Sequence, residues 1–152
     1  YQDFLSTLGL SGRPCKSAKD AITNADVIIP LTTAEQPYIE DSWIKTGSLY
    51  SAVSLLDPKL AVLTQSDCIF VDDEKLCKHE GRPLQKLEEQ GLLKNKKVIE
   101  VGTWLNNPSL FVREADHKIF FNPMGTVITD LALSANVVKN AIINDSGVFL
   151  DV

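Results

Sequence analysis

Residues 123–125, Pro-Met-Gly, could form one wall of a ligand site. They lie in FFNPMGTVITDLALSANVV (120–138), between an apolar strand candidate and a long apolar helix. Such a corner exposes backbone N–H groups at the start of a helix, and these groups suit an anionic or polar ligand. Proline and glycine are also ordinary punctuation between two elements. The corner is therefore either part of a binding site or a plain strand-to-helix turn.

Polar side chains also follow three predicted strands. Thr32 and Thr33 end the apolar run DVIIPLTT, Val53-Ser54 ends the next strand, and Asp72-Asp73 ends CIFVDD. Open α/β sheets bind ligands at the carboxyl ends of their strands, where the threonine hydroxyls could bond a ribose or an amide. The alternative is that these hydroxyls satisfy the backbone of their own loop. The two aspartates cannot converge simply, because neighbouring strand residues face opposite sides.

The elements that would position these residues alternate between strand and helix. The predicted strands cover 11–17, 26–33, 47–56, 68–73 and 119–121, and the predicted helices cover 1–9, 17–26, 58–66, 81–107 and 127–142. Ser17 would cap the second helix and Pro58 would lie in the first turn of the third. This rhythm predicts an α/β fold with a Rossmann-like, doubly wound, mostly parallel sheet.

The apolar pattern also predicts which surfaces are buried. The run 26–33 is typical of a strand buried on both faces of a parallel sheet. In the last helix, apolar residues recur at helical spacing from Val127 to Ile142, which predicts one buried face. GLSG at 9–12 does not join a strand to a helix, so it is not a phosphate-binding loop.

Composition excludes several classes of function. A net charge of -5 argues against a nucleic-acid partner, and no segment is long and apolar enough to span a membrane. Three widely spaced cysteines give no disulfide framework and fit a soluble protein of the reducing cytoplasm. Cys77 and His79 lack a second ligand pair, so no metal site is predicted.

The run NADVIIPLTTAEQPYIEDSWIKTGSLYSAVS, residues 24–54, resembles the ornithine cyclodeaminase/mu-crystallin family. VIEVGTWL looks like the E-[LV]-G helix of that family, and the 120–138 stretch looks like its closing strand, corner and helix. The matching positions are Asp26, Thr32, Thr33, Pro37, Trp43, Ile44, Gly47, Glu100, Gly102, Pro123–Gly125 and Asp130. The resemblance extends from about residue 17 to residue 143.

Within the family, EQPYIEDSWIKTG, VDD and NPMG look most like the 2,3-diaminopropionate-forming branch. That branch contains N-(2-amino-2-carboxyethyl)-L-glutamate dehydrogenases, which supply siderophore and antibiotic precursors. More typical members have an S-x-G corner and a G-G or G-A pair after the second strand. Here those places read Pro-Met-Gly and Ser54-Leu55, so the chain departs from the common pattern at both.

The resemblance implies a C-terminal part of a protein roughly twice as long. Residues 1–80 would be a partial NAD(P)-binding Rossmann domain without its glycine-rich first βαβ unit. Residues 81–152 would be a helical excursion followed by a strand and helix that return to the substrate and dimerisation domain. The implied cofactor is NAD, with NADP possible, the implied substrate is a small amino acid, and the implied assembly is a homodimer through the substrate domain.

The resemblance also implies roles for individual residues. Pro123, Met124 and Gly125 would border the nicotinamide ring. Cyclodeaminases place a catalytic aspartate after the second strand and before a proline, which makes Asp57 the candidate base, one position displaced from that pattern. Asp57 could instead cap the helix at 58–66. Lys59 could reach a ribose or a substrate carboxylate, or simply be an exposed lysine in the first turn.

Three functions follow as hypotheses. The first is an NAD(P)-dependent oxidoreductase that oxidises an N-substituted amino acid to an imine, which water then hydrolyses; an ornithine cyclodeaminase or an alanine dehydrogenase or imine reductase is its close variant. The second is a non-catalytic, mu-crystallin-like protein that binds NADPH or a small ligand. The third is a structural or regulatory fragment without a ligand. A carboxylate after the second strand favours the first.

Overall fold

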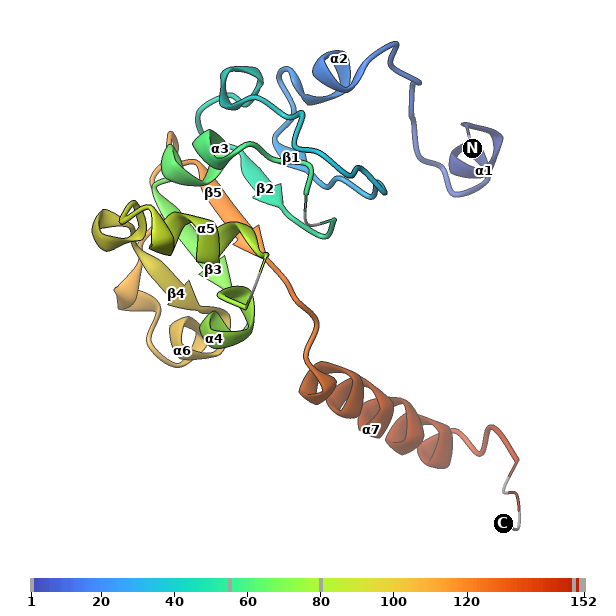
Figure 1. The fold of residues 1–152 in the computed structure, drawn as a ribbon. Coiled ribbons are helices and arrows are strands. Elements are labelled where there is room, and N and C mark those ends of the chain that lie inside the picture. The colour runs from blue at the N-terminus through green and yellow to red at the C-terminus, as the bar shows by residue number, and fades with distance from the viewer. Residues whose placement is uncertain (1, 55, 80, 149, 151–152) are drawn as a thin grey trace.

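Five short strands form one parallel sheet in the structure, a computed structural model that describes residues 2–54, 56–79, 81–148 and 150. The strands are β1 (Val27–Ile28), β2 (Leu49–Ser51), β3 (Cys68–Val71), β4 (Val98–Glu100) and β5 (Ile119–Asn122). Their order across the sheet is β1-β2-β5-β3-β4, and every pair is parallel (Figure 1). The predicted α/β fold with a parallel sheet is confirmed.

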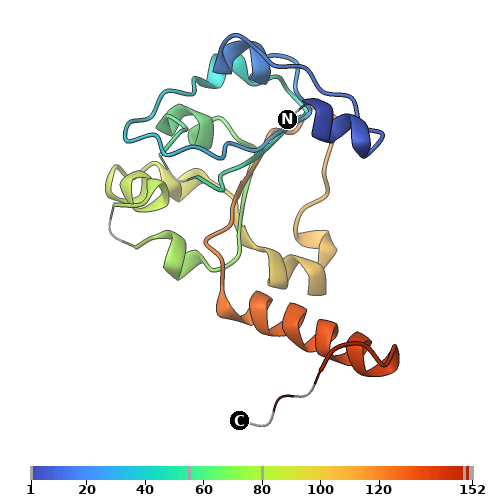
Figure 2. The same cartoon turned by 90° about the vertical axis from the view of Figure 1, so that its right-hand side faces the viewer.

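Helices lie on both faces of this sheet. The α-helices are α1 (Gln2–Thr7), α2 (Ala18–Ile22), α3 (Leu60–Thr64), α4 (Glu74–Cys77), α5 (Pro83–Glu89), α6 (Val101–Asn106) and α7 (Val127–Ile143). Three 3-10 turns join them, at Asp41–Trp43, Leu93–Asn95 and Pro108–Leu110. Figure 2 shows α3, α4 and α5 on one face and α6 on the other. We call the first the covered face and the second the open face.

The core lies under the covered face, because alternate strand residues point to opposite sides of a sheet. Tyr50 of β2 and Phe120 of β5 stack with ring centroids 5.3 Å apart. Ile69 and Val71 of β3 extend the same layer and pack with Leu63 of α3. On the open face, Leu49, Phe70 and Phe121 are only partly buried.

The prediction that 96–107 is helical throughout is wrong, because β4 occupies Val98–Glu100 and only Val101–Asn106 is helical. Val98 pairs with Ile69, and Ile99 pairs with Phe70. Val and Ile fit a pleated surface with neighbouring strands, so tertiary pairing decides this short segment.

The predictions for the N-terminal strands also need correction. Residues 11–17 form no strand, since all of them are exposed and Pro14 lacks a backbone donor. β1 is confined to two residues at the edge of the described sheet. Ile28 is buried on the covered face, whereas Val27 is 54% exposed on the other. The run 26–33 is therefore buried on one face rather than both.

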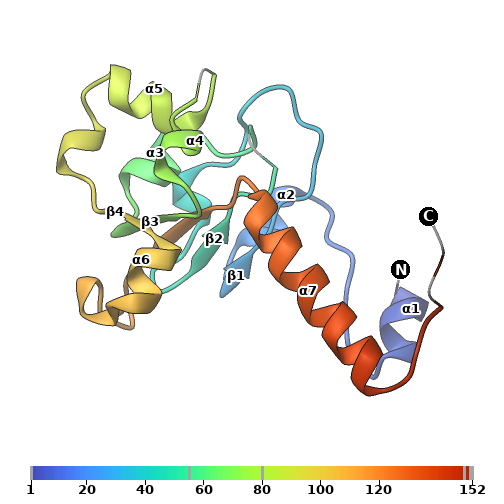
Figure 3. The ribbon, with the colours of Figure 1, turned by 90° about the horizontal axis from the view of Figure 1, so that it is seen from below.

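Helix α7 differs most from its prediction. None of its residues is buried, and Leu131 is 63% exposed. Figures 1 and 3 show the helix extending away from the sheet. Its 17 residues contain no glycine or proline, so the helix forms without the burial that the apolar spacing predicted. Within the described residues, no helix is long and apolar enough to cross a membrane.

Two sequence predictions fall on residues outside the described ones. The predicted first helix includes Tyr1, and the predicted second strand and the pair after it include Leu55. The predicted helix at residues 17–26 is confirmed as α2, and Ser17 caps it by accepting a hydrogen bond from the Asp20 N–H.

Candidate functional site

A buried carboxylate joins the loops that follow β1 and β2. The carboxylate of Asp57 accepts hydrogen bonds from the hydroxyls of Thr32 and Ser54, one on each oxygen. Asp57 is 1% exposed, whereas Thr32 is exposed to solvent. The hydroxyl of Ser54 also lies 3.0 Å from the Pro30 carbonyl oxygen. Three of the predicted site residues are thus brought together at the carboxyl edge of the sheet.

Two tyrosines lie close to this carboxylate. The backbone carbonyl of Asp57 accepts from the N–H groups of Tyr38 and Ile39, both at 2.9 Å. The Tyr50 hydroxyl is buried and, within the described residues, has no hydrogen-bond partner. Burial, and next the negative charge of Asp57, raise the pKa of Tyr50 and of Tyr38. Both phenols therefore stay protonated at neutral pH.

The Pro-Met-Gly corner follows β5, the strand beside β2. The N–H groups of Met124 and Gly125 donate to the same carboxylate oxygen of Asp72, at 2.9 and 2.7 Å. These two donors are therefore taken by the protein itself, which corrects the expectation that they are available to an anionic ligand. Gly125 has φ +76° and nothing within 4 Å of where a Cβ would lie, so its outer side is open.

The side chains of the two aspartates after β3 bond different segments of the chain. Asp72 bonds the corner, while Asp73 caps α4 by accepting from the Leu76 N–H at 2.8 Å. The thiol of Cys77 lies beneath the corner and points to the Asn122 carbonyl oxygen at 3.5 Å. Burial, and next the charge of Asp72, raise the pKa of Cys77 to about 12.

The alternative role of Asp57 as a helix cap is wrong. Helix α3 begins at Leu60 with Lys59 as its N-cap, and no side chain caps it. Pro58, predicted in the first turn of α3, instead forms a bridge with Ile39 before the helix. The Lys59 ammonium pairs with Glu40. Lys59 therefore has a partner outside the cluster of Thr32, Ser54 and Asp57.

The remaining predicted site residues lie at the same edge, and within the described residues none of them forms a hydrogen bond with Thr32, Ser54 or Asp57. Thr33 is exposed beside Thr32. Val53 is exposed beside Ser54, and its N–H donates to the Ser51 carbonyl at 3.0 Å. Pro123 and Met124 are partly buried, and Met124 packs against the core. Because β2 and β5 pair in register, their carboxyl ends bring 53–54 and 123–125 to neighbouring positions.

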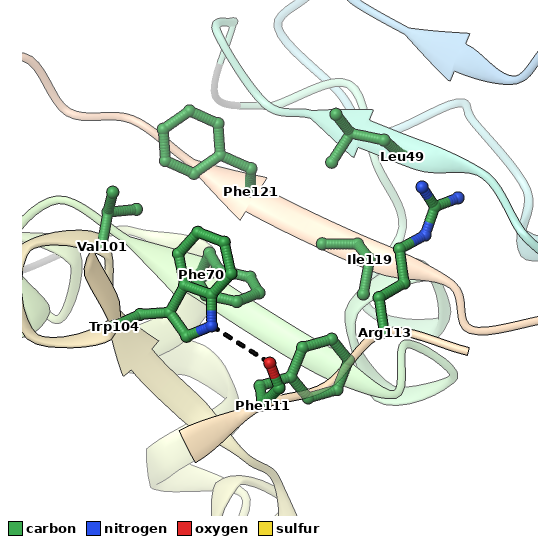
Figure 4. Close-up of a pocket in the computed structure, with 8 residues that line it drawn as sticks. All are labelled: Leu49, Phe70, Val101, Trp104, Phe111, Arg113, Ile119 and Phe121. Atoms are coloured by element: carbon green, nitrogen blue, oxygen red, sulfur yellow. Dashed lines mark hydrogen bonds between the residues drawn. The ribbon is translucent and has the colours of Figure 1, made fainter. Parts of the chain in front are cut away.

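A groove of about 370 Å³ lies on the open face of the sheet, away from this edge. Figure 4 shows aromatic side chains around it, with Trp104 donating to the Phe111 carbonyl oxygen at 3.1 Å. Phe70 meets the rings of Trp104 and Phe111 edge-on. Arg113 is the charged residue of the lining, and its guanidinium bonds the Gly47 carbonyl oxygen at 2.5 Å. Such a surface suits packing against apolar protein more than polar chemistry.

One acidic cluster in the described residues has metal-ligand geometry. Ligand atoms of Glu114, Asp116 and His117 lie within 4.8 Å of one another. The two carboxylates are exposed, and Nδ1 of His117 already accepts from the Glu114 N–H at 3.0 Å. The cluster belongs to the turn before β5 rather than to the carboxyl edge.

The sequence model of one protein family matches almost the whole chain. The model of the ornithine cyclodeaminase/mu-crystallin family covers residues 3–145. The chain belongs to this family. The resemblance inferred from the motifs of residues 24–54, 98–105 and 120–138 is therefore confirmed.

One curated protein is similar to the chain in sequence, and one solved structure is similar to it in fold. Over 127 residues the chain is 29% identical to N-((2S)-2-amino-2-carboxyethyl)-L-glutamate dehydrogenase of Staphylococcus aureus, a match that covers 83% of this chain and 38% of that protein. The crystal structure of CmnK aligns with a TM-score of 0.84 at 30% identity, over 95% of this chain and 44% of the other.

A more distant structure has the same fold. Thermococcus litoralis Δ1-pyrroline-2-carboxylate reductase, solved with NADH and L-proline, aligns with a TM-score of 0.84 at 17% identity, over 97% of this chain and 47% of the other. The chain spans less than half the length of each of these three proteins.

Sequence reasoning missed the two contacts that organise this edge. The sequence indicates Thr32, Ser54 and Asp57 as site residues, but nothing in their spacing indicates that they bond one another. It indicates no partner for Asp72, because neighbouring strand residues such as Asp72 and Asp73 face opposite sides. The signal that could have found it is its place at the end of a central strand, beside a corner with unpaired N–H groups.

Proposed function

We propose that the protein is an NAD(P)-dependent oxidoreductase of amino-acid metabolism. Its substrate would be an N-substituted amino acid of the 2,3-diaminopropionate type, oxidised to an imine that water hydrolyses. Family membership supports the class of reaction, and the likeness to the Staphylococcus aureus dehydrogenase supports this substrate. The observation that carries the proposal is the hydrogen bond between the buried carboxylate of Asp57 and the hydroxyl of Thr32, an exposed residue at the carboxyl edge.

The cofactor proposed is NAD, with NADP as the variant. The dinucleotide supplies the hydride acceptor, and the protein orients it and removes a proton. The residues fit one end of such a cofactor: the outer side of Gly125 is open, and the backbone of 123–125 could border the nicotinamide ring there. The sequence contains no strand–G-x-G–helix passage to hold the pyrophosphate. The chain by itself should therefore bind NAD weakly or not at all.

Asp57 is the proposed base, and its burial determines how it would act. A carboxylate that is 1% exposed does not touch a substrate, but it can receive a proton through a bonded hydroxyl. Thr32 would take a proton from the substrate nitrogen or from the attacking water while its own hydroxyl proton passes to Asp57. Thr33, Val53, Ser54 and Lys59 would line the cofactor side of the same edge.

A protein of the length of its relatives would bury the exposed apolar surfaces. Helix α7, the outer side of Val27 and the groove beside Phe70 all offer apolar area that the described residues leave uncovered. We expect the substrate-binding part of a full-length protein, and a second copy of it in a homodimer, to cover them. One face of α7 would then be buried, as its apolar spacing predicts.

The test is turnover of N-(2-amino-2-carboxyethyl)-L-glutamate by the full-length protein with NAD, followed as NADH formation. Thr32→Val should lower turnover as strongly as loss of a general base, on the order of 10²-fold or more. Thr32→Ser, which keeps the hydroxyl, is the matched control and should stay within a few-fold of the parent. Equal turnover by the two variants would contradict the hydroxyl relay.

A second function, a non-catalytic protein that binds NADPH or a small ligand, is favoured by one observation. Asp57 is inaccessible and both its oxygens are occupied, as expected of a residue that only holds two loops together. In that case NADPH would bind to the full-length protein with no amino-acid-dependent oxidation or reduction. Binding calorimetry together with the turnover assay separates the two functions.

A further inference from the structure

We propose that Asp72 is a positioning residue that holds the Met124–Gly125 backbone in place as the wall of the nicotinamide pocket. The proposal rests on the function proposed above, since it presumes a dinucleotide against this corner. Asp72 itself would not touch the cofactor. It would act through the two N–H groups that it binds, and so set the position of the carbonyl groups and the glycine that face the ring.

The geometry gives Asp72 three backbone donors from two segments. One oxygen accepts from Met124 and Gly125, at 2.9 and 2.7 Å, and the other accepts from the Asp73 N–H at 3.0 Å. The sequence separation of 52 and 53 residues means that the contact joins the ends of β3 and β5. Hydrogen bonds to a charged acceptor are roughly twice as strong as neutral ones.

Only a carboxylate satisfies all three donors. An asparagine at 72 accepts on one side alone and turns an N–H₂ group toward a donor on the other. An asparagine must therefore lose its hydrogen bonds either with the corner or with the Asp73 N–H. Within the described residues, Asp72 forms no ion pair, so its acceptor capacity is available for these amides.

Asp72 fixes the backbone of this corner directly, in addition to the packing of the Met124 side chain against the core. The helix that follows has no buried residue and no side-chain N-cap. Gly125 has φ +76° and open space around it, a conformation that glycine adopts without strain but does not enforce. The two hydrogen bonds to Asp72 are therefore the contacts that join the backbone N–H groups of the corner to the end of β3.

The first test measures the anchor without any cofactor. In the full-length protein, Asp72→Asn should speed hydrogen exchange at the Met124 or Gly125 amide by about tenfold or more. Asp73→Asn is the matched control, because asparagine caps a helix about as well as aspartate and this side chain does not reach the corner. Exchange unchanged by Asp72→Asn would overturn the proposal.

The second test asks whether the anchored corner meets the nicotinamide. Binding of NADH and of ADP-ribose, which lacks the nicotinamide, is compared by calorimetry in the parent, Asp72→Asn and Asp73→Asn proteins. Asp72→Asn should weaken NADH by about tenfold and leave ADP-ribose unchanged, whereas a general loss of structure would weaken both. Equal effects on the two ligands would overturn the positioning role.

A parent protein that binds neither ligand would refute the proposed function itself, a result distinct from the exchange measurement. If Asp72→Asn does not fold, Asp72→Glu serves in both tests. It keeps the charge and the number of acceptors but moves the carboxylate by one methylene. Unchanged exchange and an unchanged ratio of NADH to ADP-ribose affinity in that variant would overturn the proposal equally.

Discussion

The two edges of the sheet use aspartates in different ways. At the amino edge, Asp41 pairs with the Lys118 ammonium at 2.9 Å and Asp26 pairs with the Lys45 ammonium at 2.6 Å. At the carboxyl edge, Asp57 and Asp72 accept only from hydroxyl, thiol and backbone groups. Within the described residues, neither of the two forms an ion pair.

The difference separates a structural edge from one suited to chemistry. Charges that are paired at the amino edge contribute to stability and have nothing left to offer a ligand. Carboxylates held only by hydrogen-bond donors keep their negative charge uncompensated, and such a field favours a cationic nicotinamide or iminium group nearby. The glycines follow the same division, since Gly47 is packed against Ala115 and Gly125 is open.

The largest effect is expected from Asp57→Asn in the full-length protein. Asparagine keeps the size of the side chain and can still accept from Thr32, and the Ser54 hydroxyl can donate to the Pro30 carbonyl instead. The variant should fold and bind NADH, but lose turnover on the order of 10²–10⁴-fold because the proton acceptor is gone. Steady-state kinetics and thermal unfolding measure both. Turnover within a few-fold of the parent would make the carboxyl edge as structural as the amino edge.

The next largest effect concerns the amino edge. Gly47 has φ +77°, and a Cβ there would overlap the Ala115 carbonyl oxygen. Gly47→Ala should lower the free energy of unfolding by about 3 kcal/mol, from backbone strain together with overpacking. Gly91→Ala, at φ +69° with nothing nearby, is the control and should cost only about 1 kcal/mol. Urea unfolding gives both values, and equal values would mean that the packing around Gly47 adds nothing.

The strands and helices differ in how well the sequence predicts them. The parallel sheet, β3, β5 and α2 were predictable because their local patterns agree with the tertiary structure. β4 was not, because Val98 and Ile99 become a strand only by pairing with Ile69 and Phe70. The exposure of α7 was not predictable either, since apolar spacing reports the burial that a helix can have and not the surface that is present to bury it.

Gly125→Val is expected to have a smaller effect on stability and a selective one on the cofactor. Its φ of +76° matches that of Gly47, but no atom lies near the new side chain. The free energy of unfolding should fall by about 1–2 kcal/mol, while NADH affinity falls at least tenfold because the branched side chain fills the open side of the corner. Calorimetry with NADH and urea unfolding test this. A large loss of stability with unchanged NADH binding would make the corner a plain turn.

The smallest effect is on thiol reactivity. One buried cysteine lies at each edge of the sheet, so labelling reports on both edges. Burial raises the pKa of Cys68, at the start of β3, to about 11 and that of Cys77, under the corner, to about 12. At pH 8 only the exposed Cys15 should react quickly with an aromatic disulfide reagent. Absorbance of the released thiolate counts the reactive groups, and Cys15→Ser should abolish the fast phase. Fast labelling of a second thiol would mean that the structure around Cys68 or Cys77 opens readily.

The same shifts predict a loss of stability at alkaline pH. Unfolded cysteines ionise near their ordinary pKa of 9.0, while the folded thiols keep their protons to about 11 and about 12. The unfolded state is therefore favoured progressively as the pH rises through this range. As the pH rises from 8 to 11, the unfolding midpoint should fall less in Cys77→Ala than in the parent. An equal fall in the two proteins would contradict the assignment of this loss to the Cys77 thiol.

The place of β5 in the middle of the sheet has a consequence for synthesis of the chain. While the chain has been made through β4 but not yet through β5, β1-β2 and β3-β4 are two separate pairs, and the inner edges of β2 and β3 lack the strand that lies between them in the described sheet. Exposed parallel edges of this kind are sites of misassembly and chaperone binding. The strand that completes the sheet also ends at the Pro-Met-Gly corner. A nascent chain therefore cannot form its proposed cofactor wall before β5 has closed the sheet.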